Sequence, residues 1–142
     1  ESATRIDKSL YLPFGGGGQD IWNSTYDIPL SGASANNSRP LKTAKWVGQI
    51  KGDKDGTYIF HTNADNFAWI FINGKQVSEV RQGNGWKHYV DSDPVPMKAG
   101  EWVDIEVRFE EEGVGSPSWL RVQWSSNSMS QGNIPSSNLR TK

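Results

Sequence analysis

Apolar and polar residues alternate along several short stretches of this chain. In residues 102–109, WVDIEVRF, apolar side chains occupy every second position from Val103 to Phe109, and charged side chains lie between them. Residues 119–124, WLRVQW, repeat the pattern, with their even-numbered positions apolar. Alternation with a period of two indicates strands that bury one face. We expect these two strands to be antiparallel neighbours joined by residues 110–118.

Two further pairs of apolar runs are separated by turn signals. Residues 45–50 and 57–62 flank the stretch KGDKDG, which ends in an Asp-Gly pair of the kind found in hairpin turns. Residues 67–72 and 75–80 flank an Asn-Gly pair, which is a strong signal for a two-residue turn. The sequence therefore predicts two β-hairpins.

The remaining sequence favours turns and short strands over helices. No window of helical length shows apolar positions at helical spacing with capping residues at its ends. Residues 86–90 are a further strand candidate, and the first forty residues, rich in Gly, Ser, Asn and Pro, suit an edge strand and long loops. Short strands separated by turns predict an all-β fold, an antiparallel β-sandwich with little or no helix.

Composition limits the classes of function. The 142 residues, 35% of them hydrophobic, suit one domain spanning residues 1–142, which we expect to be a piece of a longer secreted or cell-surface protein. The formal charge of −1 gives no basic stripe for nucleic acid, and no apolar run is long enough to insert into a membrane. Cysteine is absent, which excludes disulfides and thiolate chemistry.

The sequence does not predict an enzyme. His61 and His88, the two histidines, lie in alternating strands without an obvious serine or aspartate partner, so we interpret them as ordinary strand residues. The three carboxylates of residues 110–112 could supply an acid and a base. A run of like charges at the end of a strand is more typical of a solvated surface.

A polar stretch, TNADN, interrupts the most apolar part of the chain. Asn63, Asp65 and Asn66 place side-chain oxygens at a corner between two strands, and such oxygens are the ligands that Ca²⁺ prefers. Asn and Asp also form tight turns by bonding to their own backbone. Two interpretations therefore stay open, a ligand site and a turn.

An outward-facing tryptophan is the second candidate for binding. If the apolar face of residues 119–124 is buried, Trp119 points outward beside the acidic segment, and an exposed aromatic ring commonly marks a binding surface. Flat aromatic faces pack well against the C–H faces of sugar rings. The alternative is that the N-terminal segment covers Trp119.

Linked motifs in residues 41–140 resemble the PA-fourteen domain, a module named after the N-terminal region of anthrax protective antigen. The family pattern combines a Trp-x-Gly strand, a Gly-x-Tyr-x-Phe strand, an acidic pair and an Ile-x-Ile-Asn-Gly turn. These motifs correspond to Trp46 and Gly48; Gly56, Tyr58 and Phe60; Ala64 and Asp65; and Ile70, Ile72, Asn73 and Gly74. The closing strand LRVQW and the later IPSSNL also match.

The resemblance implies a β-sandwich and a carbohydrate-binding role in a bacterial extracellular protein. Lectin-like members hold Ca²⁺ with two consecutive aspartates, and a facing loop completes the site. In this chain Ala64 stands in place of the first aspartate, so the metal ligands implied are Asp65 and, from the facing loop, Glu112. The loss of one of two anionic ligands weakens a calcium site.

The sequence thus leads to one main hypothesis and one alternative. The main hypothesis is a non-catalytic, lectin-like module that binds a polysaccharide or glycan, with calcium as its candidate cofactor and further domains tethered to it. The alternative is a structural or regulatory protein-interaction domain of a toxin-like or surface assembly. The predicted ligand-binding residues are Asn63, Asp65, Asn66, Glu111, Glu112 and Trp119.

Overall fold

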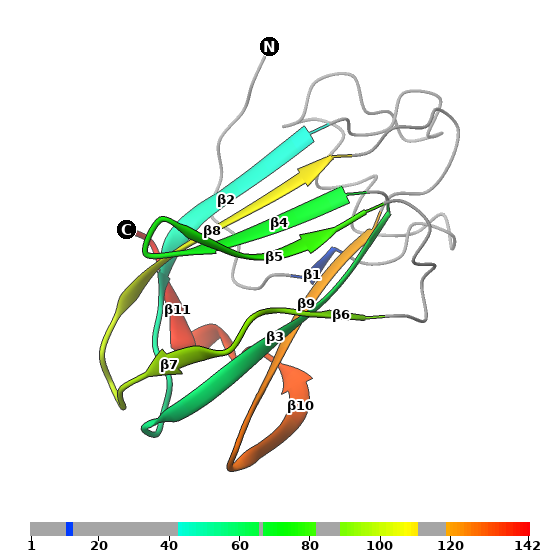
Figure 1. Cartoon of the computed structure of the whole chain (residues 1–142). Helices are drawn as coiled ribbons and strands as arrows, with labels where there is room; N and C mark the ends of the chain where they lie inside the picture. The colour runs from blue at the N-terminus through cyan, green and yellow to red at the C-terminus, as the bar shows by residue number, and fades with distance from the viewer. Residues whose placement is uncertain (1–10, 13–42, 66, 82–88, 111–118) are drawn as a thin grey trace.

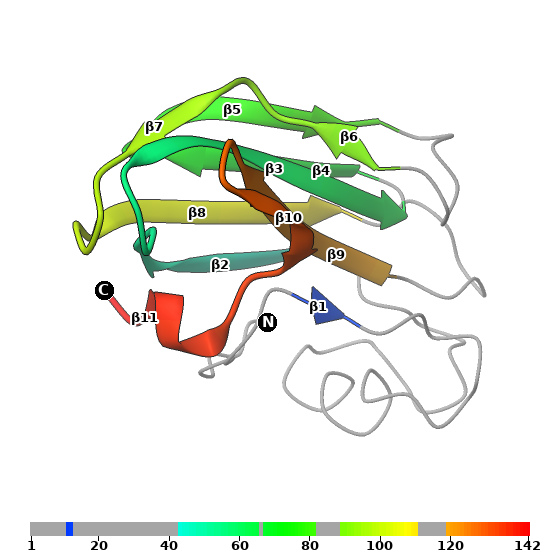
Figure 2. The same ribbon diagram turned by 90° about the horizontal axis from the view of Figure 1, so that it is seen from below.

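Two antiparallel sheets packed face to face form the described part of the chain. The structure is a computed structural model that describes residues 11–12, 43–65, 67–81, 89–110 and 119–142 (Figure 1). Within these residues the strands fall into two layers, which Figure 2 shows from a second direction. The predicted antiparallel β-sandwich is confirmed.

Sheet A is built around the long strands β3 and β9. These two pair over eight residues, and shorter strands continue the sheet on both sides, with β1 and β10 beside β9 and with β6 and β7 beside β3. The strands of sheet A are β1 (Tyr11–Leu12), β3 (Gly56–Asp65), β6 (Val90–Asp91), β7 (Val95–Met97), β9 (Trp119–Ser126) and β10 (Met129–Asn133).

Sheet B has the order β11-β2-β8-β4-β5. Its central strand β8 pairs with β2 over eight residues and with β4 over six, so it joins the two halves of the sheet. The strands of sheet B are β2 (Thr43–Ile50), β4 (Phe67–Ile72), β5 (Lys75–Val80), β8 (Val103–Glu110) and β11 (Leu139–Arg140).

The alternation in the sequence correctly predicts which faces are buried. On β8, Ile105, Val107 and Phe109 are buried, as expected, and every second residue of β4 is buried as well. The hairpin of β4 and β5 is also confirmed. Its turn places Asn73 and Gly74 at positive φ, at 49° and 81°, which is the geometry that an Asn-Gly turn favours.

Two predicted strand pairings are wrong. The strands around KGDKDG, β2 and β3, belong to different sheets, and so do β8 and β9. Both connections cross from one layer to the other instead of folding back within a sheet. The Asp-Gly stretch forms a crossing loop in which Asp53 accepts a hydrogen bond from Asn138 at 3.0 Å and Asp55 accepts one from the Ala99 amide at 2.7 Å.

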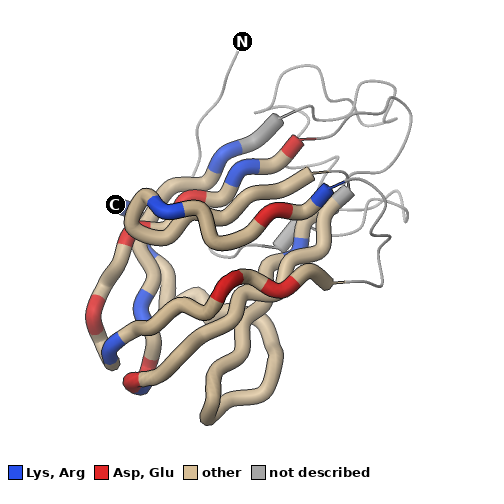
Figure 3. Tube along the Cα trace, viewed as in Figure 1, with Lys and Arg blue, Asp and Glu red and all other residues tan. Residues whose placement is uncertain are grey.

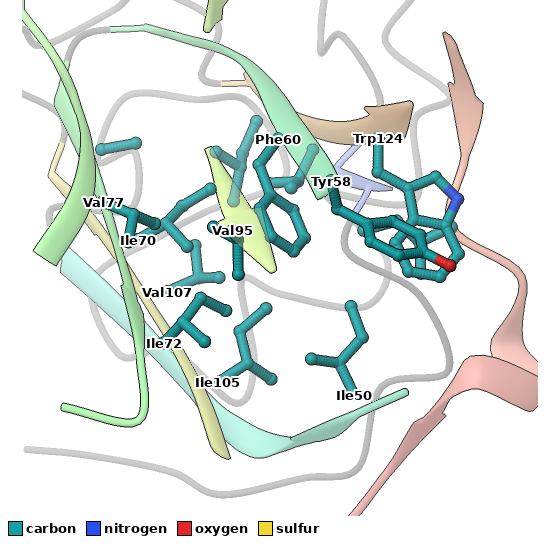
Figure 4. Close-up of a cluster of buried hydrophobic side chains, with 14 of the residues drawn as sticks. Ile50, Tyr58, Phe60, Ile70, Ile72, Val77, Val95, Ile105, Val107 and Trp124 are labelled. Atoms are coloured by element: carbon teal, nitrogen blue, oxygen red, sulfur yellow. The ribbon is translucent and has the colours of Figure 1, made fainter. Parts of the chain in front are cut away.

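The core lies between the layers and takes side chains from both. Sheet A contributes Phe60 and Trp124, whose ring centroids are 6.5 Å apart, and sheet B contributes aliphatic residues such as Ile70 and Ile105 (Figure 4). Apolar burial of this kind is the main force that holds a sandwich together.

Shorter elements complete the description. The predicted N-terminal edge strand is present as β1, which pairs with β9; the rest of the first forty residues lies outside the described residues. Of the predicted strand 86–90, residues 86–88, including His88, also lie outside, and β6 begins at Val90. Within the described residues the only helical element is the 3-10 helix η3 (Ser136–Asn138), and none is long or apolar enough to span a bilayer.

Candidate functional site

Four strand ends meet at one end of the sandwich. Asp65, the last residue of β3, is paired with Trp119, the first residue of β9. Phe67, the first residue of β4, is paired with Glu110, the last residue of β8. The chain therefore passes from sheet A to sheet B beside the place where it later returns from sheet B to sheet A. We call Asn63, Ala64, Asp65, Phe67, Glu110 and Trp119 the β3–β4 corner.

Two of the predicted binding residues become neighbours in this way. Asp65 and Trp119 are 54 positions apart in the sequence, and the antiparallel register makes them direct partners. The other predicted residues, Asn66, Glu111 and Glu112, lie outside the described residues.

Asn63 and Ala64 face away from solvent. Asn63 has 0% of its surface exposed and Ala64 has 3%, and the Ala64 methyl group belongs to the hydrophobic core. A buried amide shapes a corner but does not contact a ligand at the surface. Asn63 and Ala64 lie within β3, paired with Arg121 and Leu120, so this part of the polar stretch continues the strand instead of forming the predicted turn.

The described residues do not fit a calcium site built on two consecutive carboxylates. The position of the first family aspartate is held by Ala64, and its side chain packs into the core, where an ionised carboxylate would be costly. Among the described residues there is also no cluster of three or more His, Cys, Asp or Glu that could hold a metal. Of the two ligands that the resemblance implies, Asp65 ends β3 and Glu112 lies outside the described residues.

Glu110 and Phe67 are the further corner residues; the sequence analysis considered Glu110 only as part of the acidic run 110–112 and did not select Phe67. Glu110 is exposed, Phe67 is partly exposed, and their pairing places a carboxylate beside an aromatic ring. The alternation in FAWIFI was the available signal, because it puts Phe67 on the face opposite to the buried Ala68. Its proximity to Glu110 depends on strand order, which the sequence does not show.

A chain of hydrogen bonds links three strands on sheet A. His61 Nδ1 lies 2.7 Å from Asp91 Oδ1, and His61 Nε2 lies 2.7 Å from Ser125 Oγ. The same residue types form catalytic triads. Here Ser125 lies within a regular ladder, paired with Ile59, and His61 is only 8% exposed. We assign these hydrogen bonds a structural role, because they connect β6 and β9 to β3.

Comparisons with known proteins agree with this architecture. The sequence profile of the PA14 domain matches residues 24–138. The anti-sigma-I factor RsgI3 of Acetivibrio thermocellus is 31% identical over 97 residues, which are 68% of this chain and 15% of that protein. This chain therefore spans only a small part of that relative, and the activity of the longer protein is not transferred to it.

Solved structures show the same fold. An anti-sigma factor domain-containing protein from Clostridium clariflavum gives a TM-score of 0.74 at 20% identity, over 99% of this chain and 42% of that chain. A PA14 sugar-binding domain from an RTX adhesin gives 0.64 at 17% identity, over 96% of this chain and 77% of that chain. The family expected from residues 41–140 is thus confirmed: the chain belongs to the PA14 domain family.

Proposed function

We propose that this domain binds carbohydrate at the β3–β4 corner and does so without catalysing a reaction. The observation that carries the proposal is the strand register, which brings Asp65 beside Trp119 and Glu110 beside Phe67. Carboxylates can accept hydrogen bonds from sugar hydroxyls, and aromatic rings can pack on the sugar C–H faces. The similarity to a PA14 sugar-binding domain supports the same function.

The proposed setting is a secreted or cell-surface protein in which the domain is joined to others. Similarity to longer proteins, of which this chain spans 15% or 42%, supports a modular context. In that setting the domain would attach its parent protein to a polysaccharide or glycan. Asn66, Glu111 and Glu112 are proposed to add polar contacts from the segments that flank the corner.

A glycan array followed by titration calorimetry tests the proposal. We expect binding to at least one glycan, and we expect Asp65→Asn and Trp119→Ala each to weaken it at least tenfold. Asp93→Asn is a matched control, because it changes an exposed aspartate that lies outside the corner. Absence of binding across the array would contradict the proposal. So would affinities of both corner variants that equal the affinity of the wild type.

Calcium is tested by repeating the titration in EDTA. Because Ala64 is buried in the core, we propose that sugar binding does not depend on calcium. Unchanged affinity in EDTA is the expected result. Loss of affinity, reproduced by Glu112→Gln, would instead support Asp65 and Glu112 as ligands of a bridging Ca²⁺.

A protein-interaction role is the second candidate. Similarity to the anti-sigma-I factor RsgI3, a protein named for a regulatory function, favours it. This role would be the favoured function if no glycan on the array bound and if neither sugars nor calcium raised the melting temperature of the domain. A ligand present at a hundred times its Kd should add about 2.7 kcal/mol to the free energy of unfolding, which is readily measured.

A further inference from the structure

The outward face of β4 carries an aromatic residue at each of its three positions. Phe67, Trp69 and Phe71 alternate with buried residues, and all three are partly exposed. A sheet face that meets water normally carries polar side chains. Contiguous exposed apolar groups mark interaction sites. We call these three residues the aromatic row.

Neighbouring side chains hold the aromatic row in place. The rings of Phe67 and Trp69 are 6.1 Å apart with an angle of 11° between their planes. Trp69 Nε1 donates a hydrogen bond to Glu79 Oε2 at 3.0 Å, and the Arg108 guanidinium lies 4.7 Å from the centre of the Phe71 ring. Side chains fixed in this way lose little freedom when a ligand binds.

Two ion pairs lie beside the aromatic row. Arg108 forms an ion pair with Glu106, and Glu79 forms one with Arg81 at 2.9 Å. Figure 3 shows acidic and basic residues interspersed along β8 and its neighbours. A surface that attracts a charged polymer would carry an excess of one sign. The balance of charge here favours an uncharged ligand.

The aromatic row begins in the β3–β4 corner. Phe67 is paired with Glu110 and opens β4, so the row leads from the corner along the outer face of sheet B. With a rise of about 3.3 Å per residue, the distance along β4 from Phe67 to Phe71 is about 13 Å. This length exceeds that of one sugar ring.

We propose that a linear, uncharged polysaccharide seated at the corner continues over the aromatic row. The domain then binds several consecutive sugar units within a chain and not a single terminal sugar. The inference rests on the proposed carbohydrate-binding function and adds the class of ligand. Apolar C–H faces of successive sugars pack against the ring row, and hydroxyls meet the paired charges beside it.

Titrations with cello-, xylo- and manno-oligosaccharides, from the disaccharide to the hexasaccharide, test the inference. For at least one series the affinity should rise with chain length. Trp69→Ala should weaken hexasaccharide binding about tenfold, or about 1.4 kcal/mol, and should weaken disaccharide binding less. Trp69→Phe, which keeps an aromatic ring, should retain the dependence on length. Val47→Ala is the matched control, since Val47 is 53% exposed on β2, outside the row.

The outcomes separate this inference from the proposed function. Affinity that does not rise with chain length, or equal hexasaccharide binding by wild type and Trp69→Ala, overturns the aromatic-row site. Disaccharide binding that is lost in Asp65→Asn would still support the corner. No binding to any of these oligosaccharides overturns the aromatic-row site, whereas the corner is overturned only if no glycan on the array binds either. A dimer in sedimentation velocity that Trp69→Ala converts to a monomer would identify the row as a self-association surface and overturn the inference.

Discussion

Ala64 occupies a core position next to Asp65, the last residue of β3. Ala64 is 3% exposed and packs in the core, and Asp65 closes β3 beside Trp119. The first position of the family's acidic pair is therefore a core position in this chain, and this explains why a methyl group suits position 64.

The substitution Ala64→Asp restores the family sequence and tests this interpretation. Because the new carboxylate would be buried without a partner, we expect the free energy of unfolding to fall by about 3–5 kcal/mol. Ala64→Ser, which adds a polar group without a charge, should lose about 1–3 kcal/mol. Chemical denaturation with and without CaCl2 measures both. Recovery of Ala64→Asp by calcium would show that the carboxylate reaches an ion, contrary to the core position.

The His61 hydrogen bonds lead to a prediction about stability. His61→Ala removes both contacts and should lower the free energy of unfolding by about 2 kcal/mol, while Ser125→Ala removes one and should lower it by about 1 kcal/mol. Chemical denaturation of the wild type and of both variants measures these losses in the free energy of unfolding.

An esterase assay distinguishes this structural role from catalysis. Wild type and Ser125→Ala should hydrolyse p-nitrophenyl acetate equally slowly. Faster hydrolysis by the wild type would instead indicate that Ser125, His61 and Asp91 act as a nucleophile, a base and its partner.

At the scale of elements, the sequence predicts strands better than strand partners. Period-two alternation identifies the buried face of β8 and β4 because burial acts on each residue locally. The pairing of β2 with β8, in which Thr43 is the partner of Glu110, 67 positions later, depends on how the layers assemble. A turn signal such as KGDKDG marks a change of direction and does not specify whether the chain stays within the same sheet.

Among the short strands, β10 was not predicted because it lacks an alternating pattern. β10 reads MSQGN and its residues are mostly exposed. Its strand conformation therefore depends on pairing with β9 and not on burial. Asn138 is buried and donates a hydrogen bond to the Lys51 carbonyl at 2.8 Å, a tertiary contact without a local signal. The corner could be predicted in part: Asp65, Trp119 and the acidic run that begins at Glu110 were noted by residue type, whereas Phe67 required the register.

Gly48 allows β11 to lie against β2. A Cβ atom at this position would be 2.6 Å from the Arg140 carbonyl oxygen, a backbone atom that cannot move without disturbing β11. We expect Gly48→Ala to lower the free energy of unfolding by about 1–3 kcal/mol. Gly132→Ala is the control, because no atom lies within 4 Å of the Cβ it would add. Equal unfolding midpoints for the two variants would contradict the close contact.

For the whole molecule, Asp104 connects stability to pH. The hydrogen bond from Lys142 Nζ at 2.9 Å, followed by that from Gln49 Nε2 at 3.1 Å, lowers the pKa of Asp104 below its ordinary value. A carboxyl whose pKa falls on folding stabilises the folded state above its unfolded pKa. That stabilisation is lost as the pH falls through the folded pKa.

Lys142→Ala should therefore reduce the acid sensitivity of the protein. Relative to wild type, we expect a lower melting temperature at neutral pH and a smaller difference at pH values below the folded pKa. Thermal unfolding across the acidic range measures this, with Lys98→Ala as the control for loss of an exposed lysine. A difference between wild type and Lys142→Ala that is constant with pH would contradict the assignment.

The C-terminal strand is anchored far from the β3–β4 corner. Leu139 pairs with Ile50 at one end of β2, whereas Thr43 at the other end lies beside Glu110, and Figure 1 shows the C-terminus on the side opposite to the end of β3. An eight-residue strand separates these ends by about 23 Å. Immobilising the protein on a sensor chip through a tag after Lys142 would therefore place the corner on the side facing the flowing analyte. The support would then not obstruct access of the analyte to the corner.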